Sequence, residues 1–128
     1  MGDRVSISFV QNRSEVDRKM FGGPKQDESV VLFNHWGGEQ FPNIAVEYLR
    51  ELHQEKSNFE GDPLGRLEVS TVMVDFMRWF LGGNNFLIRD YNRVTRTLYL
   101  GADPNDGDNS DNGHFTINVD TFGVERFT

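Results

Sequence analysis

The chain of 128 residues is 37% hydrophobic and 26% charged, a composition typical of one globular domain, 1–128, with a modest core. Its formal net charge of −7 and its scattered basic residues disfavour nucleic-acid binding, and the lack of cysteine excludes disulfides and cysteine-ligated metal centres. No apolar run approaches the roughly 20 residues of a membrane span, and the N-terminus has no signal-peptide core. We therefore expect a soluble, cytoplasmic protein that binds neither nucleic acid nor membrane.

Two strands are predicted in the first third of the chain. Residues 4–10 alternate between apolar and polar side chains, which is typical of a strand with one buried face. The continuous apolar run within 29–34 predicts a strand that is buried on both faces and lies inside the sheet. The polar segment 12–27 between them is expected to be a long loop, either a functional flap or a disordered connection.

Two helices are predicted next, with no strand between them. Apolar residues over 41–56 recur at helical spacing and form one stripe. A second helix is predicted from Pro63 or Arg66 to Leu81, with Asp62 as its N-cap. Because this helix is apolar nearly all round, we expect it to pack on two sides.

The last third of the chain again shows the alternation of apolar and polar residues that is typical of strands. Segments 86–91 and 94–101 are predicted to pair as a hairpin, and a polar loop over 103–113 follows. Residues 114–119 alternate with their odd-numbered side chains inward, and 124–128 form a short last strand. The order β-β-α-α-β-β-β-β predicts an α+β fold, in which a mainly antiparallel sheet carries both adjacent helices on one face.

Part of this last third resembles a known family. The segments Gly101-Ala102-Asp103-Pro104 and 113–120, followed by Gly123, resemble the strand–loop–strand meander after the paired helices of proteasome-type N-terminal-nucleophile hydrolases. That family uses a processed N-terminal Thr, Ser or Cys, whereas this chain opens Met1-Gly2-Asp3. No catalytic lysine or C-terminal helices match either. The resemblance therefore implies an abbreviated, inactive relative of that fold.

The junction after the second strand is the first candidate site. His35 titrates near neutral pH, Glu39 can orient it from four residues away, and Asn34 can assist. The Gly-Gly pair between His35 and Glu39 would let a substrate approach the backbone. In a structural alternative, His35 and Trp36 close one end of the core, and Glu39 complements the dipole of the following helix.

The acidic loop 103–113 is the second candidate site. It supplies enough oxygen ligands for a hard cation such as Ca²⁺, although its spacing does not match an EF-hand. The alternative is a solvated loop in which Asp, Asn and Gly favour turns. No other cofactor is expected. The candidate ligands are Asp103, Asp106, Asp108 and Asp111.

The remaining chemistry-bearing residues favour structure over catalysis. His53 is predicted to be solvent-exposed on the polar side of the first helix, and no nucleophile-elbow, HExxH or GxGxxG motif is present. Four aromatic residues are expected to pack in the core rather than line a pocket: Trp36, Tyr48, Trp79 and Tyr91.

These patterns favour a small acidic binding or accessory module without catalytic activity, acting on a protein or small-molecule partner, with homo-oligomerisation left open. The first alternative is a small hydrolase-like enzyme that uses His35 and Glu39. The second is a divalent-cation-binding module at 103–113.

Overall fold

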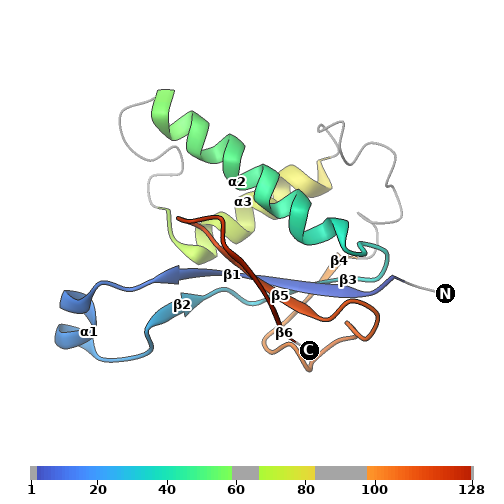
Figure 1. The fold of residues 1–128 in the computed structure, drawn as a ribbon, viewed down its shortest axis with the longest axis horizontal. Helices are drawn as coiled ribbons and strands as arrows, with labels where there is room; N and C mark the ends of the chain where they lie inside the picture. The colour runs from blue at the N-terminus through green and yellow to red at the C-terminus, as the bar shows by residue number, and fades with distance from the viewer. Residues whose placement is uncertain (1–2, 59–66, 83–97, 128) are drawn as a thin grey trace.

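The computed structural model describes residues 3–58, 67–82 and 98–127, and it confirms the α+β class (Figure 1). The elements in chain order are β1 (Val5–Asn12), α1 (Glu15–Phe21), β2 (Gln26–Glu28), β3 (Val31–Asn34), α2 (Gln40–Asn58), α3 (Val69–Leu81), β4 (Leu98–Gly101), β5 (His114–Asn118) and β6 (Val124–Phe127). No described helix has both the length and the apolar character that crossing a membrane would need.

The strands form one mixed sheet in the order β4-β3-β1-β5-β6, and β2 also pairs with β1. The pairing of β1 with β5 is parallel, and the other described pairings are antiparallel. The predicted mainly antiparallel sheet is therefore confirmed, and β3 lies inside it as expected. The parallel pairing joins segments about a hundred residues apart and sets Ser6 beside His114.

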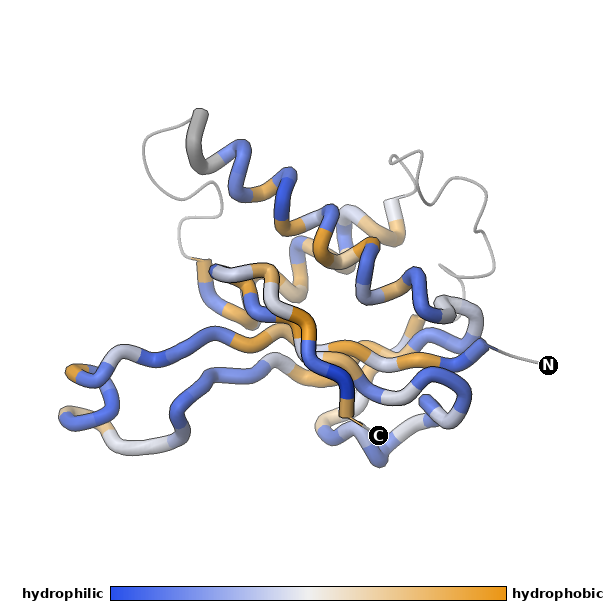
Figure 2. The backbone as a smooth tube through the Cα atoms, in the orientation of Figure 1, coloured by the Kyte–Doolittle hydropathy of each residue, from blue (hydrophilic) through white to orange (hydrophobic). Residues whose placement is uncertain are grey.

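Helices α2 and α3 pack on one face of this sheet, as predicted (Figure 1). Hydrophobic residues concentrate where the helices face the strands (Figure 2). Phe76 of α3 is fully buried, and its ring centroid lies 5.4 Å from that of Phe9 and 5.4 Å from that of Tyr48. Trp36 and Trp79 pack against the same core, so three of the four aromatic predictions hold. Tyr91 lies outside the described residues.

The segment 12–27 is not a plain loop, because it contains α1 and β2. The Ser14 hydroxyl accepts a hydrogen bond from the Asp17 N–H at 3.1 Å and caps α1. Acidic residues in the first turn and basic residues in the last turn complement the helix dipole. The Ser-x-x-Asp pattern is a helix-start signal of the capping type, and the loop prediction overlooked it.

Three further expectations need correction. Helix α3 begins at Val69 with Glu68 as N-cap, so residues 67–68, inside the predicted helix, are not helical. Its outer side is exposed at Val74, so the helix is not covered all round. His53 is partly buried, because its Nε2 lies 2.7 Å from the Val119 carbonyl oxygen and its ring meets Phe122 edge-on. The predicted Asp62 cap and segment 86–97 of the predicted hairpin lie outside the described residues.

Strand β1 is buried on both faces rather than one. Val5, Ile7 and Phe9 face the helices, as the alternation predicts. Ser6 and Ser8 are also 0% exposed. The side of the sheet turned away from α2 and α3 is therefore covered too, and its polar side chains define the candidate site.

Candidate functional site

A line of hydrogen-bonded polar side chains lies on the sheet face opposite α2 and α3. The Ser6 Oγ is 2.8 Å from His114 Nδ1, and the Ser8 Oγ is 3.2 Å from His114 Nε2. Alternate residues of a strand share one face, and the parallel pairing of β1 with β5 places His114 between the two hydroxyls. His114 is buried, so both ring nitrogens take their partners from the protein.

The two ends of this line fix the direction of its hydrogen bonds. The Ser8 hydroxyl donates to Glu28 Oε1 at 2.7 Å, because an ionised carboxylate can only accept. Its one proton is thereby used, so His114 must donate from Nε2 to Ser8. Nδ1 of a neutral imidazole then accepts from the Ser6 hydroxyl, whose oxygen accepts from Asn109 Nδ2 at 2.8 Å. The donors thus run in one direction, from Asn109 to Glu28.

This arrangement needs an uncharged His114. Burial lowers the pKa of the imidazole below its usual value, against the opposing fields of Glu28 and Asp103. A protonated ring would donate from both nitrogens, and Nδ1 could no longer accept from Ser6. The environment therefore holds His114 neutral near physiological pH, in the tautomer that completes the line.

A pocket of about 560 Å³ opens above these groups. It lies between the loop after β4 and the strands β5 and β6, and the Glu28 carboxylate lines it. The Arg126 guanidinium lies over the Phe115 ring, 5.8 Å from its centroid, and Phe115 packs against the helix side of the core. The lining residues of the pocket include Glu28, Asn105, Asn109, Thr116, Arg126 and Phe127. A second hollow of about 480 Å³ shares Glu28, Thr116 and Phe127 with it and runs towards Lys25. The two form adjoining parts of one groove.

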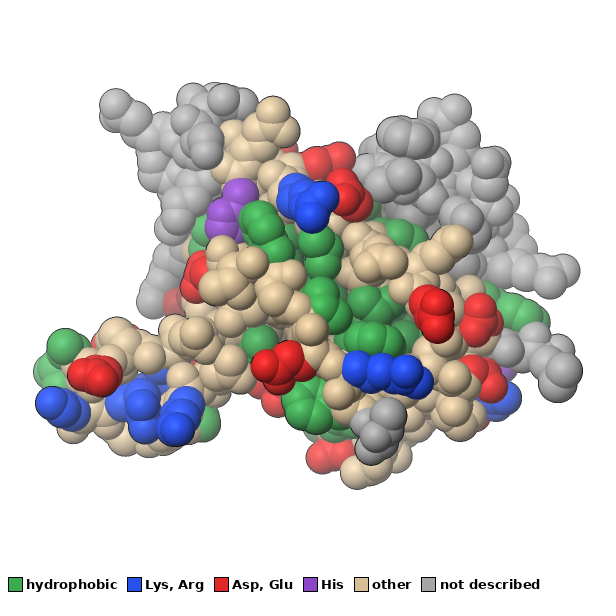
Figure 3. Space-filling model, in the orientation of Figure 1, with side chains coloured by type: hydrophobic (Ala, Val, Ile, Leu, Met, Phe, Trp, Pro, Cys, Tyr) green, Lys and Arg blue, Asp and Glu red, His purple; other side chains and the backbone are tan. Residues whose placement is uncertain are grey.

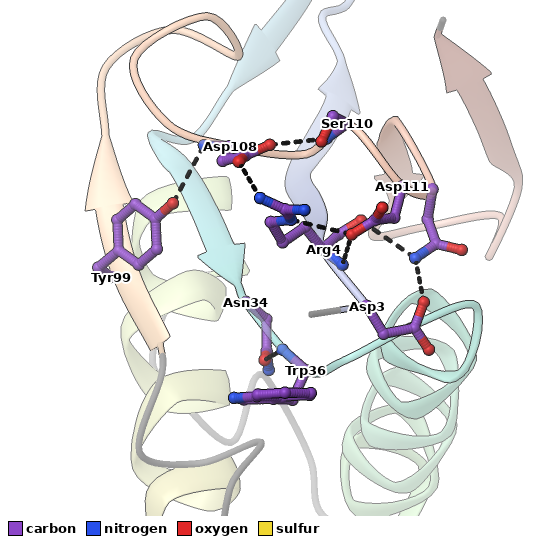
Figure 4. Close-up of polar contacts among 9 residues, drawn as sticks. Asp3, Arg4, Asn34, Trp36, Tyr99, Asp108, Ser110 and Asp111 are labelled. Carbon is purple, nitrogen blue, oxygen red and sulfur yellow. Dashed lines mark hydrogen bonds and ion pairs between the residues drawn. The ribbon is translucent and has the colours of Figure 1, made fainter. Parts of the chain in front are cut away.

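Arg4 holds the loop that forms one wall of the pocket (Figure 4). Its Nη1 is 2.6 Å from an oxygen of Asp108, and its Nε and backbone N–H both lie 2.9 Å from Asp111 Oδ2. Hydrogen bonds from Ser110 lower the pKa of Asp108, and those from Arg4 lower the pKa of Asp111. The Asp108 backbone N–H donates to the Tyr99 hydroxyl at 3.1 Å. These contacts hold the loop as a hydrogen-bonded structure.

The four aspartates predicted as cation ligands accept hydrogen bonds from different groups of the protein. Asp108 and Asp111 bind the Arg4 guanidinium, which supplies a positive charge of its own. Asp106 accepts from the backbone N–H groups of residues 102 and 103, and Asp103 accepts from that of residue 105. Among the described residues, no three His, Asp or Glu side chains converge in a way that could hold a metal ion.

The predicted acid–base group around His35 is also separated. The Asn34 amide oxygen accepts from the Trp36 backbone N–H at 3.0 Å, and His35 packs edge-on against Trp36 with ring centroids 4.9 Å apart. Glu39 is exposed and lines a different hollow, whose described lining lacks both His35 and Asn34. Gly38 has a positive φ of 59°, which a residue with a side chain would adopt only with strain, and its backbone N–H donates to the Asp3 carbonyl at 2.8 Å. The glycine therefore serves the turn at this junction.

Ser6, Ser8 and Glu28 were not predicted as site residues from the sequence. The polar side chains that alternate through 4–10 were interpreted as a solvated face, since a single strand does not reveal what covers it. The signal was weak: a strand with serines at alternate positions and a histidine at the start of a distant strand. Only the parallel pairing across the sheet unites them.

Comparison of this chain with family models, curated proteins and solved structures gave no match. The resemblance to proteasome-type hydrolases therefore stays an expectation, and only the geometry of the site bears on the function.

Proposed function

We propose that this protein is a non-catalytic binding module whose ligand occupies the pocket bordered by loop 102–113, β5 and β6. The observation that supports this proposal is the directed line of hydrogen bonds from Asn109 to Glu28 beneath the pocket. It fixes the side chains of Glu28 and Asn109 at the pocket wall before any ligand arrives. Such preorganisation lowers the cost of binding.

The Ser6–His114 pair favours a protein without catalytic activity. A serine hydroxyl that donates to a histidine nitrogen is the arrangement of an activated nucleophile. However, Ser6 is 0% exposed and its oxygen is already engaged by Asn109. A nucleophile must reach the substrate, and this one is covered. The alternative enzyme built on His35 and Glu39 gains no support, because these side chains make no hydrogen bond with each other in the described chain.

The lining suggests the chemistry of the ligand. Glu28 offers a carboxylate, Asn109 offers an amide, and Phe127 is half exposed at the pocket edge. We expect a small primary amine that carries an apolar group, with its ammonium towards Glu28 and its apolar group on Phe127. The volume of about 560 Å³ suits a ligand of this size.

Isothermal titration with a panel of small primary amines tests the proposal. We expect saturable binding of at least one member, weakened about tenfold or more by Asn105→Trp, which fills the pocket from an exposed position. The matched control is Asn43→Trp on the exposed side of α2, which should bind as the wild type does. Binding that Asn105→Trp leaves unchanged would place the ligand elsewhere. Chemical conversion of a bound ligand, followed by NMR, would contradict the non-catalytic assignment.

A cytoplasmic location is part of the same proposal. It is supported by the acidic, cysteine-free sequence, which suits a protein that needs no disulfides for its stability.

A further inference from the structure

The polar face of the sheet forms the floor of a groove that is longer than the pocket alone. Strand β1 turns Ser6, Ser8, Val10 and Asn12 to this face, because alternate residues of a strand share one side. This row spans about 20 Å at about 3.3 Å per residue. The pocket of about 560 Å³ is lined by His114, which pairs with Ser6, and the hollow of about 480 Å³ is lined by Val10 and Asn12. The groove therefore follows β1 along most of its length.

Glu28 and Phe127 lie where the two parts of the groove meet, since both residues line the pocket and the hollow. The Ser8 hydroxyl donates to Glu28 Oε1 at 2.7 Å, and no described residue donates to Oε2. The Phe127 side chain is half exposed. An amine that is bound by Glu28 and packs its apolar group on Phe127 therefore has the second hollow open to the rest of its structure.

The far end of the second hollow is positively charged. Lys25 lines it, is exposed, and has no ion-pair partner among the described residues. Lys25 belongs to the segment 13–25, which holds four basic and two acidic residues. Figure 3 shows basic side chains gathered on this segment. An anionic group of a ligand is therefore attracted to this end of the groove.

Two side-chain amides lie between the two charged ends of the hollow. Gln26 Nε2 donates to Asn12 Oδ1 at 2.8 Å, and both residues line the hollow. This contact leaves Gln26 Oε1 as an acceptor and Asn12 Nδ2 as a donor, because each amide carries both kinds of group. One acceptor beside one donor matches the N–H and C=O of a peptide group.

The spacing of the two charges sets the length of the ligand. Lys25 and Glu28 are three residues apart along extended backbone, which separates their Cα atoms by about 10 Å. An extended tripeptide spans the same distance of about 10 Å from its ammonium to its carboxylate, at about 3.3 Å per residue. A single amino acid covers only about a third of this length and does not reach both charges.

We propose that the ligand is a short free peptide of about three residues, which occupies both parts of the groove. Its N-terminal ammonium lies at Glu28, its first side chain is apolar and packs on Phe127, and its C-terminal carboxylate faces Lys25. Its peptide groups lie over Asn12 and Gln26. This inference rests on the proposed function, to which it adds the carboxylate, the peptide groups and the second hollow.

Isothermal titration with three probes tests the inference: leucinamide, the tripeptide Leu-Gly-Gly and the C-terminal amide of that tripeptide. Leucinamide supplies only the amine and the apolar group. We expect Leu-Gly-Gly to bind about tenfold more tightly, because it also fills the second hollow. Its amide should bind about fivefold more weakly than the acid, which is the contribution of an exposed ion pair. This preference should shrink in about 0.5 M salt, which screens the pair.

Lys25→Met should remove the preference for the acid over the amide. It should leave the affinity for leucinamide unchanged, because Lys25 does not line the first pocket. The matched control is Lys19→Met, an exposed residue of α1 that lines neither part of the groove, and it should keep the fivefold preference. Both lysines are exposed, so circular dichroism should show an unchanged fold.

The outcomes separate this inference from the proposed function. If leucinamide binds as tightly as both peptides, the inference is overturned and the proposed function stands. Equal affinity of the wild type for the acid and the amide, or a preference that Lys25→Met retains, would also overturn it, since the carboxylate would not face Lys25. Failure of all three probes to bind would contradict the proposed function itself and this inference with it.

Discussion

The two faces of the central sheet are both buried but by different physical means. On the helix face, Val5, Ile7 and Phe9 pack against apolar side chains that shield them from water. On the opposite face, Ser6 and Ser8 are equally buried, yet each hydroxyl has partners that replace water. The free energy gained by apolar burial is proportional to the buried area and depends little on exact geometry. The stability of a buried line of hydrogen bonds depends on every member having its partner. The first face supplies stability, and the second fixes specific side chains in place.

The largest expected loss comes from the apolar face. Phe76→Ala should lower the free energy of unfolding by about 3–5 kcal/mol, because it removes a fully buried ring at the centre of an aromatic cluster. Chemical denaturation measures this. Val74→Ala, at an exposed position of the same helix, is the control and should change the value by less than about 0.5 kcal/mol. A loss below about 1 kcal/mol for Phe76→Ala would rule out its placement in the core.

On the polar face, a much smaller change in side-chain size should already lower the free energy of unfolding. Ser8→Ala removes a single oxygen, but it leaves the His114 Nε2–H without its acceptor in a buried place. We expect a loss of about 1–3 kcal/mol by the same measurement. Ser70→Ala, on the exposed side of α3, is the matched control and should be close to neutral. If both alanine variants were equally stable, the buried hydrogen-bond line would contribute nothing to folding.

The polar face should also make stability depend on pH. Burial lowers the pKa of His114 in the folded protein, so below about pH 6.5 the unfolded chain binds more protons than the folded one. The melting temperature should therefore fall as the pH drops from about 7 through this range. His114→Gln should flatten this part of the profile, and the control His35→Gln should preserve it. An identical profile in the two variants would assign the effect to another group.

The smallest effect is expected at the exposed contacts of Arg4. Arg4→Gln removes both ion pairs that hold loop 102–113, so hydrogen exchange of its backbone amides should become faster with little change in melting temperature. Arg50→Gln, which removes an exposed ion pair on α2, is the control and should leave that loop unchanged. The wild-type loop should lose part of its protection below about pH 4, since the pKa values of Asp108 and Asp111 are lowered and their contribution disappears as these groups become protonated. Unchanged exchange in Arg4→Gln would show that Arg4 does not hold the loop.

Some of the fold was predictable because its signals are local. The stripe over 41–56 and the apolar run before Asn34 depend on residues within a few positions of each other, and both elements are where they were predicted. The cap at Ser14 is an equally local signal. The loop prediction for 12–27 was wrong because this signal was overlooked, although the sequence contains it. The predicted exposure of His53 was wrong for a different reason, because its contacts Val119 and Phe122 are distant from it in the sequence.

The sequence by itself determined the class of fold, the helix face of the core and the absence of cysteine chemistry, because composition and periodicity act over short distances along the chain. Only the tertiary structure decided the polar site. His114 reaches Ser6 through a parallel pairing of strands about a hundred residues apart, and Arg4 reaches Asp108 and Asp111 across a similar span. Such contacts depend on which strands become neighbours in the sheet, and this choice is made by the packing of the whole chain rather than by any local pattern.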